Sequence, residues 1–143
     1  MKTFLDTNVI LDVLAKREPF YIDSAKVLTL VNEKIVSGYL SATTVNNIYY
    51  ILRKLTNKET AKNFITEILE SFEIIPVTKV ILNQANRIKI PDFEDGIQFF
   101  SALDGGCDFL ITRNAKDYPK LGIKIISPAE FSISDSWHSK TII

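Results

Sequence analysis

The segment Phe4-Leu5-Asp6-Thr7-Asn8-Val9 decides how the rest of this chain is interpreted. A short apolar run stops at a carboxylate, and residues suited to capping a helix follow directly, so we expect Thr7 or Asn8 to cap the first helix. This order is typical of a buried strand that delivers an acid to the edge of a sheet. A buried carboxylate requires a cation or hydrogen-bond donors as its partner. Asp6 is therefore the first candidate for a functional residue.

The composition is that of a single globular domain. A chain of 143 residues can bury a substantial core, and 46% hydrophobic with 24% charged residues are ordinary proportions. Lys+Arg and Asp+Glu both number 17, so the formal net charge is zero, which argues against a protein that coats nucleic acid electrostatically. The single cysteine, Cys107, excludes an internal disulfide and a cysteine-built metal site.

Hydrophobic runs in this sequence are short. None approaches the roughly 20 residues of a membrane span, and Asp6 interrupts any signal-peptide core. We therefore predict a cytoplasmic protein with no membrane association.

Strand-like and helix-like segments alternate along the chain. The predicted strands are 3–5, 38–40, 73–77, 108–112 and 123–126. Alternation with helical segments predicts a three-layer α/β/α sandwich with a central, mainly parallel sheet of four or five strands. We assign residues 1–131 to one domain and residues 132–143 to a loosely held C-terminal tail.

Aspartates from separate stretches converge on one edge of this predicted sheet. Right-handed crossovers bring the carboxyl ends of parallel strands to the same edge, where ligands of open α/β folds bind. Asp6 and Asp117 follow strands, and Asp92 and Asp95 open a helix antiparallel to the next strand. Carboxylates so close repel each other, and a divalent cation relieves this repulsion. Because only oxygen donors are present, we predict Mg²⁺ or Mn²⁺, with these metal ligands: Asp6, Asp95, Asp92 and Asp117.

Structural explanations of the same residues stay open. Asp92 and Asp95 have the spacing of a capping box, and acids in a first helical turn are favoured by the helix dipole. Asp117 also suits a turn, and Asn8 suits a helix cap. These residues therefore need a structure to separate the two roles.

Together these motifs resemble the PIN domain family, and within it the bacterial branch related to VapC-type toxins. The resembling stretches are 4–9, 41–44 with 48–52, 92–95 and 108–118, and the similarity extends over about residues 2–131. The resemblance implies a Mg²⁺- or Mn²⁺-dependent ribonuclease that hydrolyses RNA phosphodiester bonds, a homodimer and, for toxin members, a small antitoxin as partner. An acidic cleft accepts single-stranded or looped RNA more easily than a duplex.

The resemblance also assigns roles to individual residues. Asp6 matches the family's first acid, and Asp95 matches the acid that opens the later helix. The predicted catalytic residues are Asp6, Asp95, Asp92, Asn114 and Asp117, and the predicted substrate-binding residues are Thr112, Arg113 and Asn8. Two positions depart from the family pattern, because Asn47 stands where Glu is usual and Asn114 where Asp is frequent.

Two other functions are alternatives. A PIN-fold module with weakened catalysis that binds RNA or a protein would explain Asn47 and Asn114. A phosphatase of the haloacid dehalogenase type would use Asp6 as its nucleophile. That chemistry needs a second Asp two residues later, where this chain has Asn8.

Overall fold

The computed structural model describes residues 1–134 and contains one parallel sheet. Its five strands lie in the order β3-β2-β1-β4-β5. The strands are β1 (Lys2–Leu5), β2 (Ser37–Ser41), β3 (Phe72–Ile75), β4 (Phe109–Ile111) and β5 (Lys124–Ile126). The helices are α1 (Thr7–Leu14), α2 (Tyr21–Asn32), α3 (Ala42–Leu55), α4 (Lys58–Ser71), α5 (Lys79–Arg87), α6 (Phe93–Asp104), the 3₁₀ turn η1 (Ala115–Asp117) and α7 (Pro128–Ile133).

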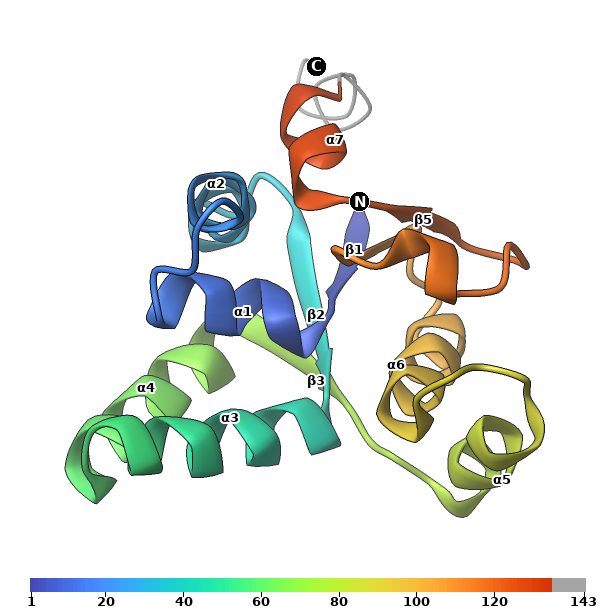
Figure 1. Ribbon diagram of the computed structural model, residues 1–143, viewed down its shortest axis with the longest axis horizontal. Helices are drawn as coiled ribbons and strands as arrows, with labels where there is room; N and C mark the ends of the chain where they lie inside the picture. Colours follow the sequence, from blue (N-terminus) through green and yellow to red (C-terminus); the bar gives the residue numbers. More distant parts are fainter. Residues whose placement is uncertain (135–143) are drawn as a thin grey trace.

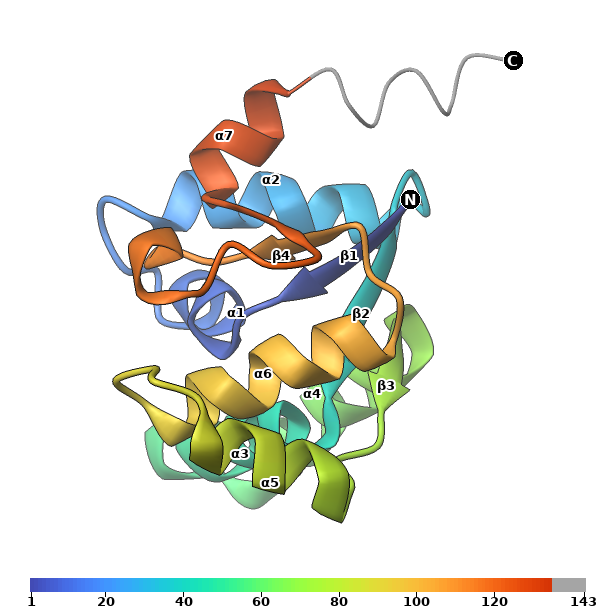
Figure 2. The ribbon, with the colours of Figure 1, turned by 90° about the vertical axis from the view of Figure 1, so that its right-hand side faces the viewer.

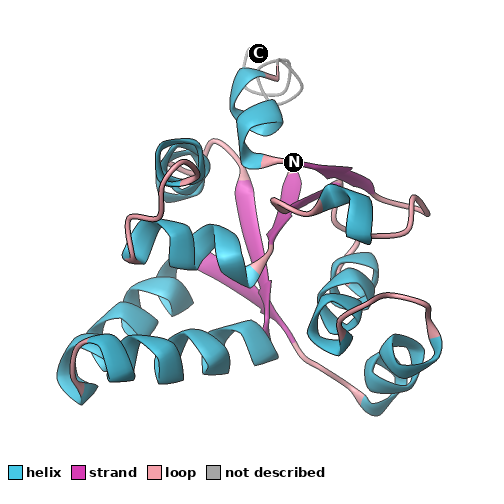
Figure 3. Cartoon of the chain, in the orientation of Figure 1, coloured by secondary structure: helices cyan, strands magenta, loops and turns pink. Residues whose placement is uncertain are grey.

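Helices cover both faces of the sheet (Figures 1 and 3). On one face lie α1, α2, α3, α4 and α7. On the other face α6 lies along the sheet, and α5 packs against α6 (Figure 2). The predicted three-layer α/β/α sandwich is therefore confirmed, with a sheet that is parallel throughout.

The central strand β1 contributes side chains to the hydrophobic clusters on both faces of the sheet. Phe4 and Leu5 are each fully buried, and they belong to different hydrophobic clusters because successive side chains of a strand point to opposite faces. Leu5 packs with residues of α1 and α2, whereas Phe4 packs with Phe99 and Ala102 of α6. A strand buried on both faces explains why the consecutive residues Phe4 and Leu5 are both apolar.

Strands β1 and β4 end together at the edge that carries the acids. Leu5 is paired with Ile111, and the backbone N–H of Asp6 donates to the Ile111 carbonyl at 2.9 Å. This pairing places Asp6 beside Thr112, the residue that follows β4. The predicted convergence on one sheet edge is thus built from backbone hydrogen bonds.

Some predicted boundaries differ from the structure. Strand β3 ends at Ile75 instead of 77, because Pro76 has no N–H to continue the ladder. The predicted loop 113–122 contains η1. Helix α7 continues to Ile133, beyond the predicted domain boundary at 131, and most of the predicted tail, residues 135–143, lies outside the described residues. No helix among residues 1–134 has the length and hydrophobicity needed to cross a membrane.

Gly38 provides a test of the packing between β2 and its neighbours. A methyl group at this position would lie 2.6 Å from the Phe72 ring and 2.7 Å from Val31 Cγ1. We expect Gly38→Ala to lower the free energy of unfolding by about 1–3 kcal/mol, as overpacking does. Urea denaturation measures this, with Ser37→Ala at the exposed start of the same strand as the control. Equal stability of the two variants would contradict the packing described here.

Candidate active site

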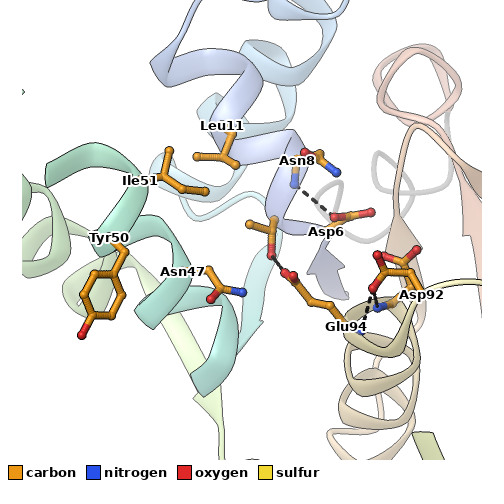
Figure 4. A pocket seen from close by; sticks show the side chains of 10 residues that line it. Asp6, Asn8, Leu11, Asn47, Tyr50, Ile51, Asp92 and Glu94 are labelled. Atoms are coloured by element: carbon orange, nitrogen blue, oxygen red, sulfur yellow. Dashed lines mark hydrogen bonds between the residues drawn. The ribbon is translucent and has the colours of Figure 1, made fainter. Parts of the chain in front are cut away.

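A pocket of about 380 Å³ opens at the carboxyl end of the sheet between α1, α3 and α6 (Figure 4). Its lining residues are Asp6, Thr7, Asn8, Leu11, Asn47, Tyr50, Ile51, Asp92, Glu94 and Asp95. Four of these residues are acids and none is Lys or Arg. The pocket therefore joins Asp6, Asp92, Asp95 and Asn8, as the sequence predicted, but it does not include Asn114 or Asp117.

Asp6 is buried and held by hydrogen-bond donors that carry no charge. Only 2% of the residue is exposed. Its Oδ1 accepts from the backbone N–H of Asn8 at 3.0 Å, and its Oδ2 accepts from Thr112 Oγ1 at 2.7 Å. The first bond makes Asp6 itself the N-cap of α1. The expectation that Thr7 or Asn8 caps this helix was wrong, and one oxygen of Asp6 does have a structural role.

Gln98, on α6, bridges the two central carboxylates. Its Oε1 accepts from the backbone N–H of Thr7 at 2.8 Å. Because that group can only donate, the amide orientation is fixed and Nε2 must face the acids. Nε2 donates to Asp6 Oδ1 at 3.3 Å and to Asp95 Oδ1 at 3.5 Å. A neutral amide thus spans the carboxylates from two different elements.

Tyr118 contacts the same two carboxylates from the loop after β4. Its hydroxyl lies 3.2 Å from Asp95 Oδ1 and 3.4 Å from Asp6 Oδ2. Burial, followed by the charges of Asp6 and Asp95, raises the pKa of Tyr118 far above its usual range. The hydroxyl therefore stays protonated and serves as a donor.

The surroundings of Asp95 disfavour its ionised form. Burial, then the charges of Asp6 and Asp92, raises the pKa of Asp95 from 3.8 to about 6. The hydrogen bond from Tyr118 opposes this shift, and the charge of Glu94 adds to it. Asp95 is therefore an acid whose charged form lacks sufficient compensation from the protein.

Asp92 and Glu94 complete the acidic side of the pocket. Asp92 Oδ1 accepts from the backbone N–H groups of Glu94 and Asp95 at 2.7 and 3.3 Å, which makes Asp92 the N-cap of α6. Glu94 Oε1 accepts from Thr7 Oγ1 at 3.2 Å. Asp92 thus has the capping role that its spacing suggested while it also lines the pocket.

Asn114 and Asp117 lie in the segment after β4, away from the pocket lining. The backbone N–H of Asn114 donates to Thr112 Oγ1 at 3.1 Å, and Asp117 ends η1. The turn directs the next residue, Tyr118, toward Asp6 and Asp95. Catalytic or metal-binding roles for Asn114 and Asp117 stay predictions.

Thr112 and Arg113 are already engaged within the protein. Thr112 is fully buried, so we expect it to act through Asp6 and not as a substrate contact. The Arg113 Nε lies 2.9 Å from Asp12 Oδ2, and its guanidinium carbon lies 4.1 Å from the centre of the Phe20 ring. Burial raises the pKa of the Asp12 carboxyl against the opposing effect of Arg113. A contact between Arg113 and RNA phosphates stays a prediction.

Asn8 also interacts with a charged side chain. Its Oδ1 accepts a hydrogen bond from Arg17 Nη1 at 3.4 Å, and its backbone N–H donates to Asp6 Oδ1, the cap of α1. Asn8 nevertheless lines the pocket. Its predicted substrate contact is therefore compatible with its position and stays a prediction.

Three residues of this site were missed from the sequence: Gln98, Tyr118 and Glu94. Gln98 lies one helical turn after Asp95, on the same helix face. A polar residue in an otherwise buried helical segment was the available signal. Tyr118 was hidden because the neighbouring Asp117 fitted the expected chemistry better.

The donor chemistry suits a divalent cation. Within residues 1–134, no three His, Cys, Asp or Glu side chains are close enough to form a ready-made metal cage. The Asp6–Asp95 pair nevertheless fits such an ion, because Mg²⁺ keeps several waters and is often bound through only one or two carboxylates. In the described part of the chain both ion pairs involve Asp12, so no Lys or Arg neutralises the pocket acids.

Comparison with known proteins identifies the family. A model of the PIN domain matches residues 2–116 of this chain. The chain therefore belongs to the PIN domain family, as its motifs suggested. The family model does not support the haloacid dehalogenase alternative, because it assigns the chain to the PIN domain.

The chain is also similar to a ribonuclease and to proteins of solved structure. The chain is 28% identical to the ribonuclease VapC1 of Aquifex aeolicus over 135 residues, covering 91% of this chain and 92% of that protein. The fold resembles VapBC2 of Rickettsia felis bound to a DNA fragment from its promoter, with a TM-score of 0.66 and 18% identity, covering 89% of this chain and 98% of that one. It also resembles FitAcB of Neisseria gonorrhoeae, with a TM-score of 0.62 and 23% identity, covering 89% and 98%.

The raised pKa of Asp95 predicts that this residue destabilises the metal-free protein at neutral pH. The folded-state pKa of about 6 exceeds the ordinary value of 3.8, so stability falls as the pH rises between these values. Asp95→Asn mimics the protonated form. We expect this variant to be more stable than the parent at about pH 7 and similar to it at about pH 4.

Denaturation in the presence of a chelator measures this difference. Asp104→Asn, the same change at the exposed end of α6, is the control and should show no such pH dependence. A stability loss at both pH values for Asp95→Asn would contradict the electrostatic description of the site.

Proposed function

We propose that this protein is a Mg²⁺- or Mn²⁺-dependent endoribonuclease. The observation that carries the proposal is the pair of carboxylates, Asp6 and Asp95, held together by neutral donors and open to a pocket without Lys or Arg. The relative called ribonuclease VapC1 supports the same substrate class. Family membership supports hydrolytic cleavage of a phosphodiester bond.

The mechanism assigns a role to each residue around the pair. Asp6 and Asp95 would hold the metal, with Asp92 at the pocket edge assisting directly or through water. Held by these residues, Mg²⁺ or Mn²⁺ would supply Lewis-acid chemistry, lowering the pKa of a water and stabilising charge on the phosphate. Gln98 and Tyr118 fix the orientation of both carboxylates, and Thr112 fixes Asp6. Such supporting contacts commonly change metal affinity or activity by about 10–100-fold.

Single-stranded or looped RNA is the substrate form that this pocket favours. The acids of the pocket disfavour a rigid duplex with its two charged backbones. An extruded strand can instead present one phosphate to the carboxylates. Asn8, Arg113 and the segment with Asn114 and Asp117 lie around the same sheet edge and are the candidates for further substrate contacts.

A small antitoxin is the proposed protein partner. The solved relatives include VapBC and FitAcB assemblies with folds like this one. We infer that this chain is the toxin of a toxin–antitoxin pair, acts in the cytoplasm and forms a homodimer. Co-purification with the product of a neighbouring gene would test the partner.

The second candidate is a binding module with weakened catalysis. Asn47 lines the pocket and brings no charge to it, and Asn114 likewise carries no charge. Such a module would bind RNA or protein without cutting. Cleavage that depends on the pocket acids separates this candidate from the nuclease.

A cleavage assay tests the nuclease directly. With Mg²⁺ or Mn²⁺ the parent should cleave single-stranded RNA, and Asp6→Asn and Asp95→Asn should each reduce kcat by about 100-fold or more, as loss of charge-stabilising groups does. Asp104→Asn on α6 serves as the matched control and should remain active. Equal cleavage by the parent and both site variants would assign the activity elsewhere and overturn the proposal.

A further inference from the structure

The pocket has a second wall whose chemistry differs from the acidic one. This wall is formed by Leu11 of α1 and by Asn47, Tyr50 and Ile51 of α3, and it lies opposite Asp92 and Glu94 at the start of α6 (Figure 4). Leu11 is buried, with 5% exposed. The metal-binding role of the pocket uses none of these side chains, so the second wall requires its own explanation.

Tyr50 presents an aromatic ring at the outer part of this wall. The residue is 55% exposed, although its neighbour Tyr49 packs its ring against it edge to face, with centroids 5.7 Å apart at 74°. This T-shaped contact supports the Tyr50 ring, while more than half of the residue stays exposed. A large aromatic surface beside a polar pocket is the usual platform for an unpaired base.

Asn47 adds a hydrogen-bonding group to the apolar wall. Tyr50 and Ile51 follow it by three and four residues on α3, so all three side chains share one helix face. Asn47 lines the pocket, and none of the hydrogen bonds described for residues 1–134 uses its side-chain amide. That amide offers both a donor and an acceptor, which suits the edge of a nucleobase.

The charge of the pocket determines where binding energy can come from. Its lining contains acids but no Lys or Arg, so contacts between cations of the protein and RNA phosphates are absent from the lining itself. Stacking does not depend on charge and contributes about 1–3 kcal/mol per base. The second wall can therefore supply affinity that the acidic wall cannot.

We propose that Asn47, Tyr50 and Ile51 bind one unpaired nucleobase of the RNA substrate beside the Asp6–Asp95 pair. Tyr50 stacks on the base, Ile51 and Leu11 contact it with apolar surface, and the Asn47 amide recognises its edge. This inference rests on the proposed ribonuclease function and specifies how that site selects single-stranded RNA. It also gives Asn47 a role that a carboxylate at the same position would not perform.

Fluorescence of a base analogue tests the stacking. Single-stranded RNA of about eight nucleotides, with 2-aminopurine placed at each position in turn, is titrated with the protein in Ca²⁺ to follow binding separately from cleavage. We expect quenching at one preferred position with the parent. Tyr50→Ala should abolish this quenching and weaken binding by about 5–100-fold, whereas Tyr50→Phe should retain both. Tyr21→Ala, a tyrosine on α2 outside the pocket, is the matched control.

Base preference separates the roles of Asn47 and Tyr50. Tyr50→Ala should weaken binding of all four bases at the preferred position to a similar extent, because every base can stack. Asn47→Ala should instead reduce the difference between bases, because a side-chain amide distinguishes base edges. Equal binding by the parent and Tyr50→Ala, or no quenching at any position, would overturn the inference.

These outcomes are distinct from those that test the nuclease. Quenching that depends on Tyr50, without any cleavage in Mg²⁺ or Mn²⁺, would support the base site and contradict the ribonuclease. Cleavage that depends on Asp6, without quenching at any position, would do the reverse.

Discussion

The burial of the Asp6 carboxylate among uncharged donors is the interaction on which this structure depends. A backbone N–H, a threonine hydroxyl, a glutamine amide and a tyrosine hydroxyl surround its two oxygens. These donors make the buried charge tolerable but leave its negative potential in place. Burial, followed by the negative charges of Asp6 and Asp92, raises the pKa of Asp95. The acids of the pocket therefore favour a bound cation, because no Lys or Arg of the described residues forms an ion pair with them.

The arrangement of the sheet and helices explains how Thr112, Gln98 and Tyr118, from different segments, contact the carboxylate at the end of β1. Strand β1 ends at Asp6, and the adjacent β4 ends at Thr112 because Leu5 and Ile111 are paired. Helix α6 starts at the same edge and contributes Gln98 from its second turn. The turn after β4 then contributes Tyr118. A substitution that shifts any of these elements alters the site even without contacting the substrate, because the donor set is shared among them.

Much of this could be predicted from the sequence, and the exceptions have physical reasons. Short apolar runs before Asp6 and around Leu110 predicted strands of a parallel sheet, and the acids at the strand ends predicted the edge at which the pocket opens. The capping role of Asp6 was missed because its own side chain outcompetes those of Thr7 and Asn8 for the helix N-terminus. Gln98 and Tyr118 were missed because their contacts with Asp6 and Asp95 depend on how their side chains are oriented in the folded protein. The hydrogen bond from the Thr7 N–H fixes the orientation of the Gln98 amide. The η1 turn places Tyr118, instead of Asp117, in contact with Asp6 and Asp95.

A calorimetric titration with Mn²⁺ tests the central claim most directly. The acids of this pocket repel each other and have only neutral partners, so the parent should bind Mn²⁺ in a saturable manner. Asp6→Asn should lose that binding while Asp104→Asn retains it. The absence of heat at about millimolar Mn²⁺, a concentration near the weak end of protein cation sites, would contradict the account. Binding that survives Asp6→Asn unchanged would contradict it equally.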